Sequence, residues 1–236
     1  SQWTGTMNSL YGVSFANADT GTVVGQNGRI LHTINGGVYW TGQEYPVSFL
    51  YAIAFVDSVN GWLGGESGKL RRSTDGGLTW SPVTVDSSIY VYWPMLHFKF
   101  FSRNYGFAVG GRMDMVGVVW KTTNGGERWS ATGPAGEPIH GFHFIDSLNL
   151  LAIGGDFDVG SGMVRSKNGG QTWEYTYLGI WGEARAIAFR TPSEGWVPLG
   201  FPGTYMVTVD TGRTWHDFYT PDSTAVYDVV FTDSTH

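Results

Sequence analysis

The sequence contains no cysteine among its 236 residues. Disulfide bonds, thiolate metal sites and a cysteine nucleophile are therefore excluded. Only 14% of the residues are charged, and the 14 Lys and Arg are spread along the chain without a run. Because a phosphate backbone is bound by a basic stripe, we expect no nucleic-acid partner. No apolar run approaches the ~18 residues that a membrane-spanning helix requires, so we expect no membrane insertion.

Aromatic residues and glycine are abundant instead. Aromatic side chains make up 16% of the chain, and there are 35 glycines. So much aromatic surface fills a sizeable core, which excludes a disordered chain. Many glycines with many aromatics and few charges are typical of short strands joined by tight turns. We therefore expect an all-β protein.

A short segment with one pattern occurs five times. It reads Ser or Thr, any residue, Asn or Asp, then a glycine-containing turn that ends at Trp. The Asn or Asp and the Trp of each copy are Asn35 and Trp40, Asp75 and Trp80, Asn124 and Trp129, Asn168 and Trp173, and Asp210 and Trp215. The Trp residues recur about every 40–50 residues, which is the length of one propeller blade.

A second signal keeps the same period. Short apolar runs, each read as a strand, end at Phe15, Phe55, Phe100, Phe144, Phe189 and Phe231. Each run is followed by a turn, a second strand, a glycine turn, a third strand and the repeated segment, whose Trp opens a fourth strand. The sequence thus predicts a β-propeller of four-stranded antiparallel blades, with five near-complete repeats plus parts of another blade.

We expect one propeller domain over residues 1–236, excerpted from a longer chain. Its repeat units are predicted near 4–40, 41–80, 81–129, 130–173 and 174–215, with a partial unit at 216–236. The start resembles the tail of an earlier repeat, and the end falls where a second strand is due. Residues 1–10 carry neither the basic start nor the apolar stretch of a signal peptide.

The repeated segments have a structural interpretation. Asn-Gly and Asp-Gly favour tight turns because both residues tolerate positive φ. The Asn or Asp side chain accepts hydrogen bonds from its own turn, and the Ser or Thr hydroxyl adds another. We therefore assign these residues to the scaffold rather than to catalysis.

This segment is similar to the Asp-box, or BNR repeat. The fuller unit, best seen from Phe55 to Trp80, resembles the photosystem II stability/assembly factor-like family. The resemblance implies a β-propeller without catalysis; photosynthetic members of the family bind a precursor of a reaction-centre protein. Relatives in secreted or cell-surface bacterial proteins imply an extracellular, cell-surface or periplasmic location. Asp-boxes also occur in sialidases and xyloglucan-cleaving glycosidases, but the Arg-bearing motif of sialidases is absent near the start, so we expect no sialidase activity.

The end of each blade opposite the boxes departs most from the repeat. There the turns between second and third strands and the crossovers between blades bring aromatic and charged residues together. The candidate ligand-binding residues are Tyr92, Trp93, Arg112, Asp114, Asp156, Asp158, Trp181, Glu183 and Arg185. The alternative is that Tyr and Trp only cap the blade ends.

Other candidate chemistry is weaker. Asp156 and Asp158 resemble half of a calcium loop, but their turn offers only two carboxylates, and we expect a solvated turn and no metal. The same pair would serve as glycosidase carboxylates if a groove held them ~5–10 Å apart. His140 and His143 lie on opposite faces of a strand and do not share a metal.

These observations favour a non-catalytic propeller that binds or scaffolds a protein partner and uses no cofactor. The first alternative is a carbohydrate-binding or glycoside-hydrolysing Asp-box propeller. The second is a purely structural repeat module. The favoured function predicts a protein partner. The carbohydrate-binding alternative predicts a carbohydrate ligand, and the structural alternative predicts no ligand.

Overall fold

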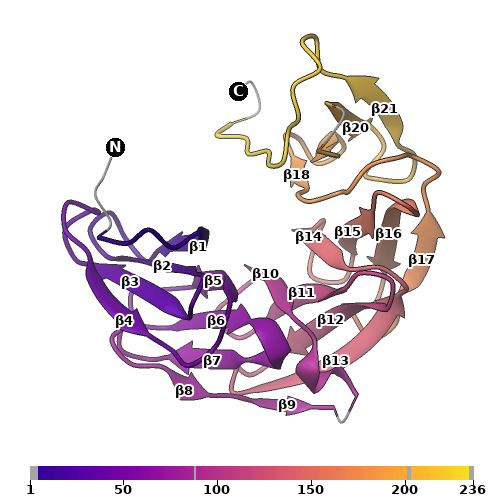
Figure 1. Cartoon of the computed structure of the whole chain (residues 1–236). Helices are drawn as coiled ribbons and strands as arrows, with labels where there is room; N and C mark the ends of the chain where they lie inside the picture. The colour runs from indigo at the N-terminus through magenta and orange to yellow at the C-terminus, as the bar shows by residue number, and fades with distance from the viewer. Residues whose placement is uncertain (1–4, 88, 201–202, 234–236) are drawn as a thin grey trace. The chain divides into compact units, whose positions relative to one another are not determined.

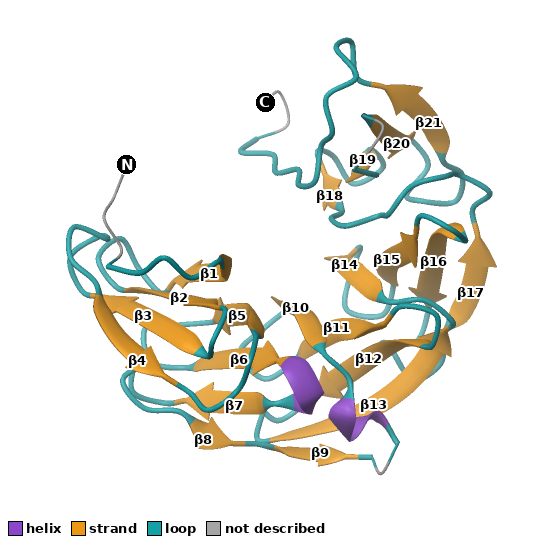
Figure 2. Cartoon of the chain, viewed as in Figure 1, coloured by secondary structure: helices purple, strands orange, loops and turns teal. Residues whose placement is uncertain are grey.

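The computed structural model describes residues 5–87, 89–200 and 203–233 (Figure 1). Its regular structure consists of short strands. The only helical elements among these residues are two 3-10 turns, η1 (Glu66–Gly68) and η2 (Tyr90–Tyr92) (Figure 2). In the described part of the chain, no helix is long and apolar enough to cross a membrane.

The strands form five separate sheets, of which the first two follow the predicted plan. The first sheet contains β1 (Leu10–Phe15), β2 (Gly21–Gly25), β3 (Arg29–Thr33) and β4 (Thr41–Glu44). The second contains β5 (Leu50–Phe55), β6 (Gly61–Gly65), β7 (Leu70–Ser73) and β8 (Ser81–Pro82). In both, each strand pairs antiparallel with the next along the chain. The fourth strand follows the box Trp, so each sheet extends past the end of its predicted repeat unit.

The remaining sheets repeat this order. The third contains β10 (Met95–Phe100), β11 (Gly106–Arg112), β12 (Val116–Thr122), β13 (Arg128–Ala135) and an added strand, β9 (Thr84–Asp86). The fourth contains β14 (Ile139–Phe144), β15 (Leu150–Asp156), β16 (Gly160–Ser166) and β17 (Glu174–Tyr177). The fifth contains β18 (Ala188–Phe189), β19 (Gly195–Pro198), β20 (Thr204–Thr208) and β21 (His216–Tyr219). The last two sheets are also antiparallel throughout.

An aromatic pair explains why Phe and Trp recur with one period. The Phe that ends the first strand packs edge-on against the box Trp, which lies just before the fourth strand or, for Trp129, at its start. In the second sheet the Phe55 and Trp80 ring centroids lie 6.0 Å apart at 68°. The equivalent pairs are Phe15 with Trp40, Phe100 with Trp129, and Phe189 with Trp215. Edge-to-face aromatic packing of this kind stabilises a pair beyond its buried area.

The same Phe explains the glycine that opens the second strand. A Cβ added to Gly61 would lie 2.6 Å from the Phe55 ring, and one added to Gly195 would lie 2.6 Å from the Phe189 ring. The glycine therefore makes room for the aromatic pair. In the fourth sheet Leu150 stands at this position opposite Phe144, and there Phe142 packs against Trp173.

Contacts divide the chain into two compact units, which we describe separately. The first unit comprises Ser1–Ala108 and Trp120–Thr132, and the second comprises Val109–Val119 and Gly133–His236. Each has its own apolar core. Leu50, Ile53 and Leu63 are buried in the first, and Leu151, Ile153 and Met206 in the second.

Two features differ from the expected strand pattern. The run from Tyr227 to Phe231 was predicted as a strand but has no strand structure. An isolated bridge joins Gly200 to Val226 just before this run. The second feature is β9, which was not predicted; it pairs parallel with β13, and Arg128 lies 3.2 Å from Asp86 across the pair.

Candidate functional site

The five box segments form turns that satisfy their own polar groups. In the fourth copy, the Ser166 hydroxyl donates to Asn168 Oδ1 at 3.0 Å and accepts from the Gly170 N–H at 2.8 Å. Asn168 Oδ1 also accepts from the Thr172 N–H at 3.0 Å. The same three bonds occur in the copies built on Thr33, Ser73, Thr122 and Thr208. These side chains are thus occupied within their turns.

The box turns lie at the same end of each sheet as the turns between first and second strands. The residue directly after the Asn or Asp donates a backbone bond to that neighbouring turn, as in Gly76 N–H to the Val59 carbonyl at 3.0 Å. We call this the box end. The opposite, crossover end holds the turns between second and third strands and the connections between sheets, which meet there through bonds such as Gly155 N–H to Pro138 O at 3.1 Å.

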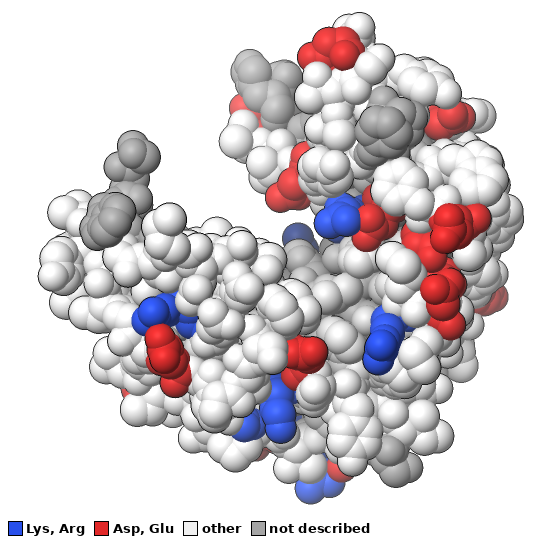
Figure 3. Space-filling view, viewed as in Figure 1, with Lys and Arg blue, Asp and Glu red and all other residues white. Residues whose placement is uncertain are grey.

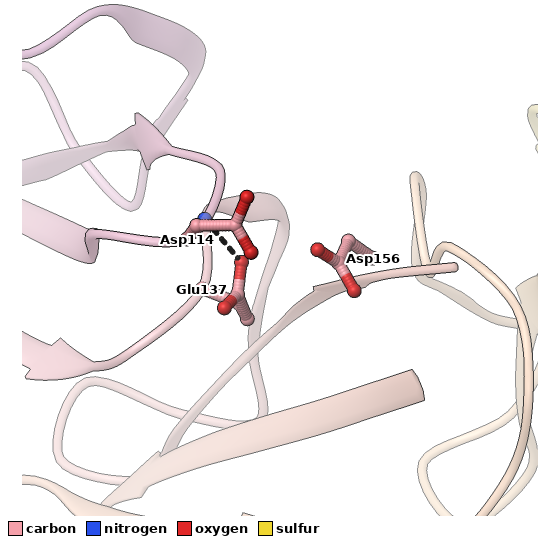
Figure 4. Close-up of side chains that lie close together, drawn as sticks. All are labelled: Asp114, Glu137 and Asp156. Carbon is pink, nitrogen blue, oxygen red and sulfur yellow. Dashed lines mark hydrogen bonds between the residues drawn. The ribbon is translucent and has the colours of Figure 1, made fainter. Parts of the chain in front are cut away.

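At the crossover end of the second unit, three carboxylates converge from three different segments. Asp114 comes from the β11–β12 turn, Glu137 from the connection between β13 and β14, and Asp156 from the end of β15. One carboxylate oxygen from each residue lies within 4.8 Å of the other two. The Asp114 N–H donates to Glu137 Oε2 at 3.0 Å, and the Asp156 carboxylate faces the other two (Figure 4). We call these three residues the acidic cluster.

Burial differs sharply within the acidic cluster. Asp114 is exposed, Glu137 is half-buried and Asp156 is only 1% exposed. Asp156 Oδ1 accepts the N–H groups of Asp158 and Val159, whereas its buried Oδ2 has no hydrogen bond. Burial, followed by the negative charges of Asp156 and Asp114, raises the pKa of Glu137. On the face shown in Figure 3, acidic side chains gather on the second unit.

A second charged group lies at the same end of this unit. Glu183 is 7% exposed, and its carboxylate lies 2.6 Å from Arg185 Nη2 and 3.3 Å from His140 Nε2. Burial lowers the pKa of His140 to about 4, because the raising effect of Glu183 is smaller than the cost of burying the charge. The Arg185 guanidinium in turn lies over the Tyr227 ring, 5.4 Å from its centroid. Glu183 thus contacts both His140 and Arg185, and Arg185 also contacts Tyr227.

Large aromatic side chains of the second unit are exposed. Trp181 is 65% exposed, Tyr177 51% and Phe157 44%. The backbone on both sides of Trp181 is held by Ser161, whose N–H donates to Ile180 O at 2.9 Å and whose hydroxyl donates to Gly182 O at 2.9 Å. Trp181 is therefore a large exposed side chain on a fixed segment.

The structure brings together only some of the predicted site residues. Asp114 joins Asp156, and Glu183 joins Arg185, while Arg112 and Asp158 are exposed. Tyr92 and Trp93 belong to the first unit, where η2 packs against η1. Tyr92 is 71% exposed, but the Trp93 indole nitrogen is buried, so Trp93 anchors its crossover.

Sequence reasoning missed Glu137 and the role of His140. Glu137 stands alone in a Gly-Glu-Pro connection, and only the bond from the Asp114 N–H reveals its place. It also missed a polar cleft of about 270 Å³ at the box end of the first unit. That cleft is lined by Asn60, Trp62, Arg72, Arg103, Asn104, Asn124, Gly125 and Glu127.

The comparisons with known proteins concern structure alone, since no protein-family model and no curated protein sequence matches the chain. A solved structure described as YCF48 bound to D1 peptide aligns over 97% of this chain and 87% of its own, with 18% identity and a TM-score of 0.59. YCF48 from Cyanidioschyzon merolae aligns over 97% of this chain and 91% of its own, with 18% identity and a TM-score of 0.50.

The GH74 xyloglucanase from Xanthomonas campestris aligns over 89% of this chain but only 38% of its own, with 14% identity and a TM-score of 0.64. These likenesses, added to the repeated four-stranded sheets, decide the fold. The chain has a β-propeller fold. The predicted fold class, an all-β propeller of four-stranded antiparallel blades, is confirmed.

Proposed function

We propose that this propeller is a non-catalytic binding protein that holds a peptide segment of a protein partner at the crossover end of its second unit. The fold is shared with a YCF48 structure that contains a bound D1 peptide. That complex supports peptide binding as a use of the fold, while the ligand of this chain has to be sought from its own surface.

The proposal rests on the exposure of the Trp181 side chain and on the hydrogen bonds that hold the backbone beside it. Its side chain is 65% exposed, and Ser161 holds the backbone on both sides of it. An aromatic residue on a held backbone loses little backbone freedom on binding, and Trp is among the residues that most often dominate an interface. Tyr177 and Phe157 add exposed aromatic area from β17 and from the β15–β16 turn.

Two observations support binding over hydrolysis at this end. Asp156 is buried and bonds its own turn, so the pair Asp156 and Asp158 lacks the open position of two catalytic carboxylates. The cavity beside Glu137 and Tyr175 has a volume of about 10 Å³, which is the space of one water rather than of a sugar ring.

The test uses a random-sequence displayed peptide library as the probe. Peptides selected on the wild-type chain are measured by fluorescence anisotropy against Trp181→Ala and Trp181→Phe. We expect Trp181→Ala to weaken binding roughly 30-fold, as removal of a hot spot of about 2 kcal/mol does, and Trp181→Phe to retain part of the affinity. Tyr39→Ala, which removes an exposed aromatic at the box end, is the matched control. Loss of binding in Tyr39→Ala with full binding in Trp181→Ala would refute the proposal.

Carbohydrate binding is the second candidate, because a GH74 xyloglucanase shares the fold and an exposed Trp also stacks on sugars. Glycan-array binding that depends on Trp181, without peptide binding, would favour it. We also propose, from the resemblance alone, an extracellular, cell-surface or periplasmic location, which fractionation of the source cells tests.

A further inference from the structure

The acidic cluster is separate from the aromatic residues proposed above to bind a peptide. Asp114, Glu137 and Asp156 place three carboxylates within 4.8 Å of one another. Like charges held so close repel each other unless a proton or a cation lies between them. The question is therefore what neutralises them.

The buried oxygen of Asp156 points to a ligand. Asp156 is 1% exposed, its Oδ1 is used by its own turn, and its Oδ2 is buried without a hydrogen bond. The carboxylate of Asp156 faces the exposed Asp114 and the half-buried Glu137 (Figure 4). An unpaired buried carboxylate oxygen costs stability, and a coordinated cation removes that cost.

The three carboxylates of the acidic cluster indicate which class of cation would bind there. Carboxylate oxygens are hard ligands, which exclude soft metals and favour Ca²⁺, Mg²⁺ or Mn²⁺. Calcium binds oxygens at about 2.3–2.6 Å, so two oxygens on opposite sides of the ion are about 5 Å apart, whereas magnesium demands a tighter octahedron. The three ligand oxygens lie no more than 4.8 Å apart, a separation that a calcium ion between them allows.

We propose that Asp114, Glu137 and Asp156 form a calcium site at the crossover end of the second unit. Its ligands come from the β11–β12 turn, the connection before β14 and the end of β15. The ion joins these three segments and completes the coordination of Asp156 Oδ2. Asp114, being exposed, leaves the ion an open path from solvent.

The test is titration of the chelator-treated full chain with calcium chloride, followed by calorimetry and thermal unfolding. We expect one ion per chain, a rise in Tm, and weaker binding of magnesium. Asp114→Asn and Asp156→Asn each weaken calcium binding at least tenfold. Asp217→Asn, which removes one exposed carboxylate on β21, leaves the affinity unchanged within twofold.

A second readout separates an ion site from a structural role. Without calcium, Asp114→Asn raises Tm above that of the wild type, since it relieves repulsion; with saturating calcium the order reverses. Absence of saturable binding below about 1 mM, the weak limit of extracellular calcium modules, would overturn the proposal. So would unchanged affinity in both Asp114→Asn and Asp156→Asn. Neither outcome bears on peptide binding by Trp181.

Discussion

Replacing Ser166 by Ala tests the idea that the box side chains hold the scaffold. Ser166 is 1% exposed, and its hydroxyl accepts the Gly170 N–H at 2.8 Å and donates to Asn168 Oδ1 at 3.0 Å. The alanine leaves the buried Gly170 N–H without a partner, which costs about 1–3 kcal/mol. Asn168 Oδ1 keeps its bonds from Gln171 and Thr172, so the turn itself survives.

The assay is urea unfolding followed by Trp fluorescence and circular dichroism, whose transitions should coincide if the unfolding is two-state. We expect the free energy of unfolding to fall by about 2 kcal/mol and Tm by roughly 4–8 °C for a chain of this size. Ser166→Thr, the residue found in three other copies, retains the hydroxyl and stays within about 0.5 kcal/mol of wild type. A Ser166→Ala cost below that level, or an equal cost for Ser166→Thr, would refute the reasoning.

Three further predictions concern packing and pH. Gly61→Ala places a Cβ 2.6 Å from the Phe55 ring and should lower the free energy of unfolding by about 1–3 kcal/mol. Gly136→Ala, with nothing within 4 Å of its Cβ, should be neutral. Equal urea midpoints for the two variants would contradict this prediction. Burial lowers the pKa of His140 from 6.5 to about 4. The contribution of the neutral His140 to the free energy of unfolding is therefore complete above pH 6.5 and is lost as the pH falls toward 4, by about 3 kcal/mol. His140→Asn should flatten that part of the stability profile, and an unchanged slope would count against it. The pKa of Glu137 is raised, so in the calcium-free chain its protonated form contributes fully to stability below the ordinary pKa of 4.5. That contribution is lost as the pH rises through the raised pKa. Glu137→Gln should remove this loss in thermal unfolding measured across pH, and a persistent loss would refute the assignment.

Local turn chemistry made the fold predictable from the sequence. The Asn-Gly and Asp-Gly boxes and the Phe–Gly–Trp spacing each have a local physical cause: a self-bonded turn, and an aromatic ring that occupies the space of a missing Cβ. The sequence could not reveal that Tyr227 to Phe231 has no described partner strand, because a strand is stabilised by its neighbour as much as by its own residues.

The candidate site was predictable only in part. Asp114 and Asp156 were named because their turns depart from the repeat, and the structure brings them together. Glu137 was missed because its position depends on how the connection before β14 crosses the end of the sheet. Likewise, the burial of Asp156 beside the exposed Asp158 depends on the pairing of Asp156 with Gly160 at the end of β15, which composition and spacing do not show.

The added strand β9 has a consequence for aggregation. Among the fourth strands of the five sheets, β13 is the longest, with eight residues against four, two, four and four for β4, β8, β17 and β21. A long outer strand with free N–H and C=O groups is a template for pairing with another chain. Here β9 pairs with Arg128, Trp129 and Ser130, so the protein's own chain shields the first part of the strand most open to edge-to-edge association.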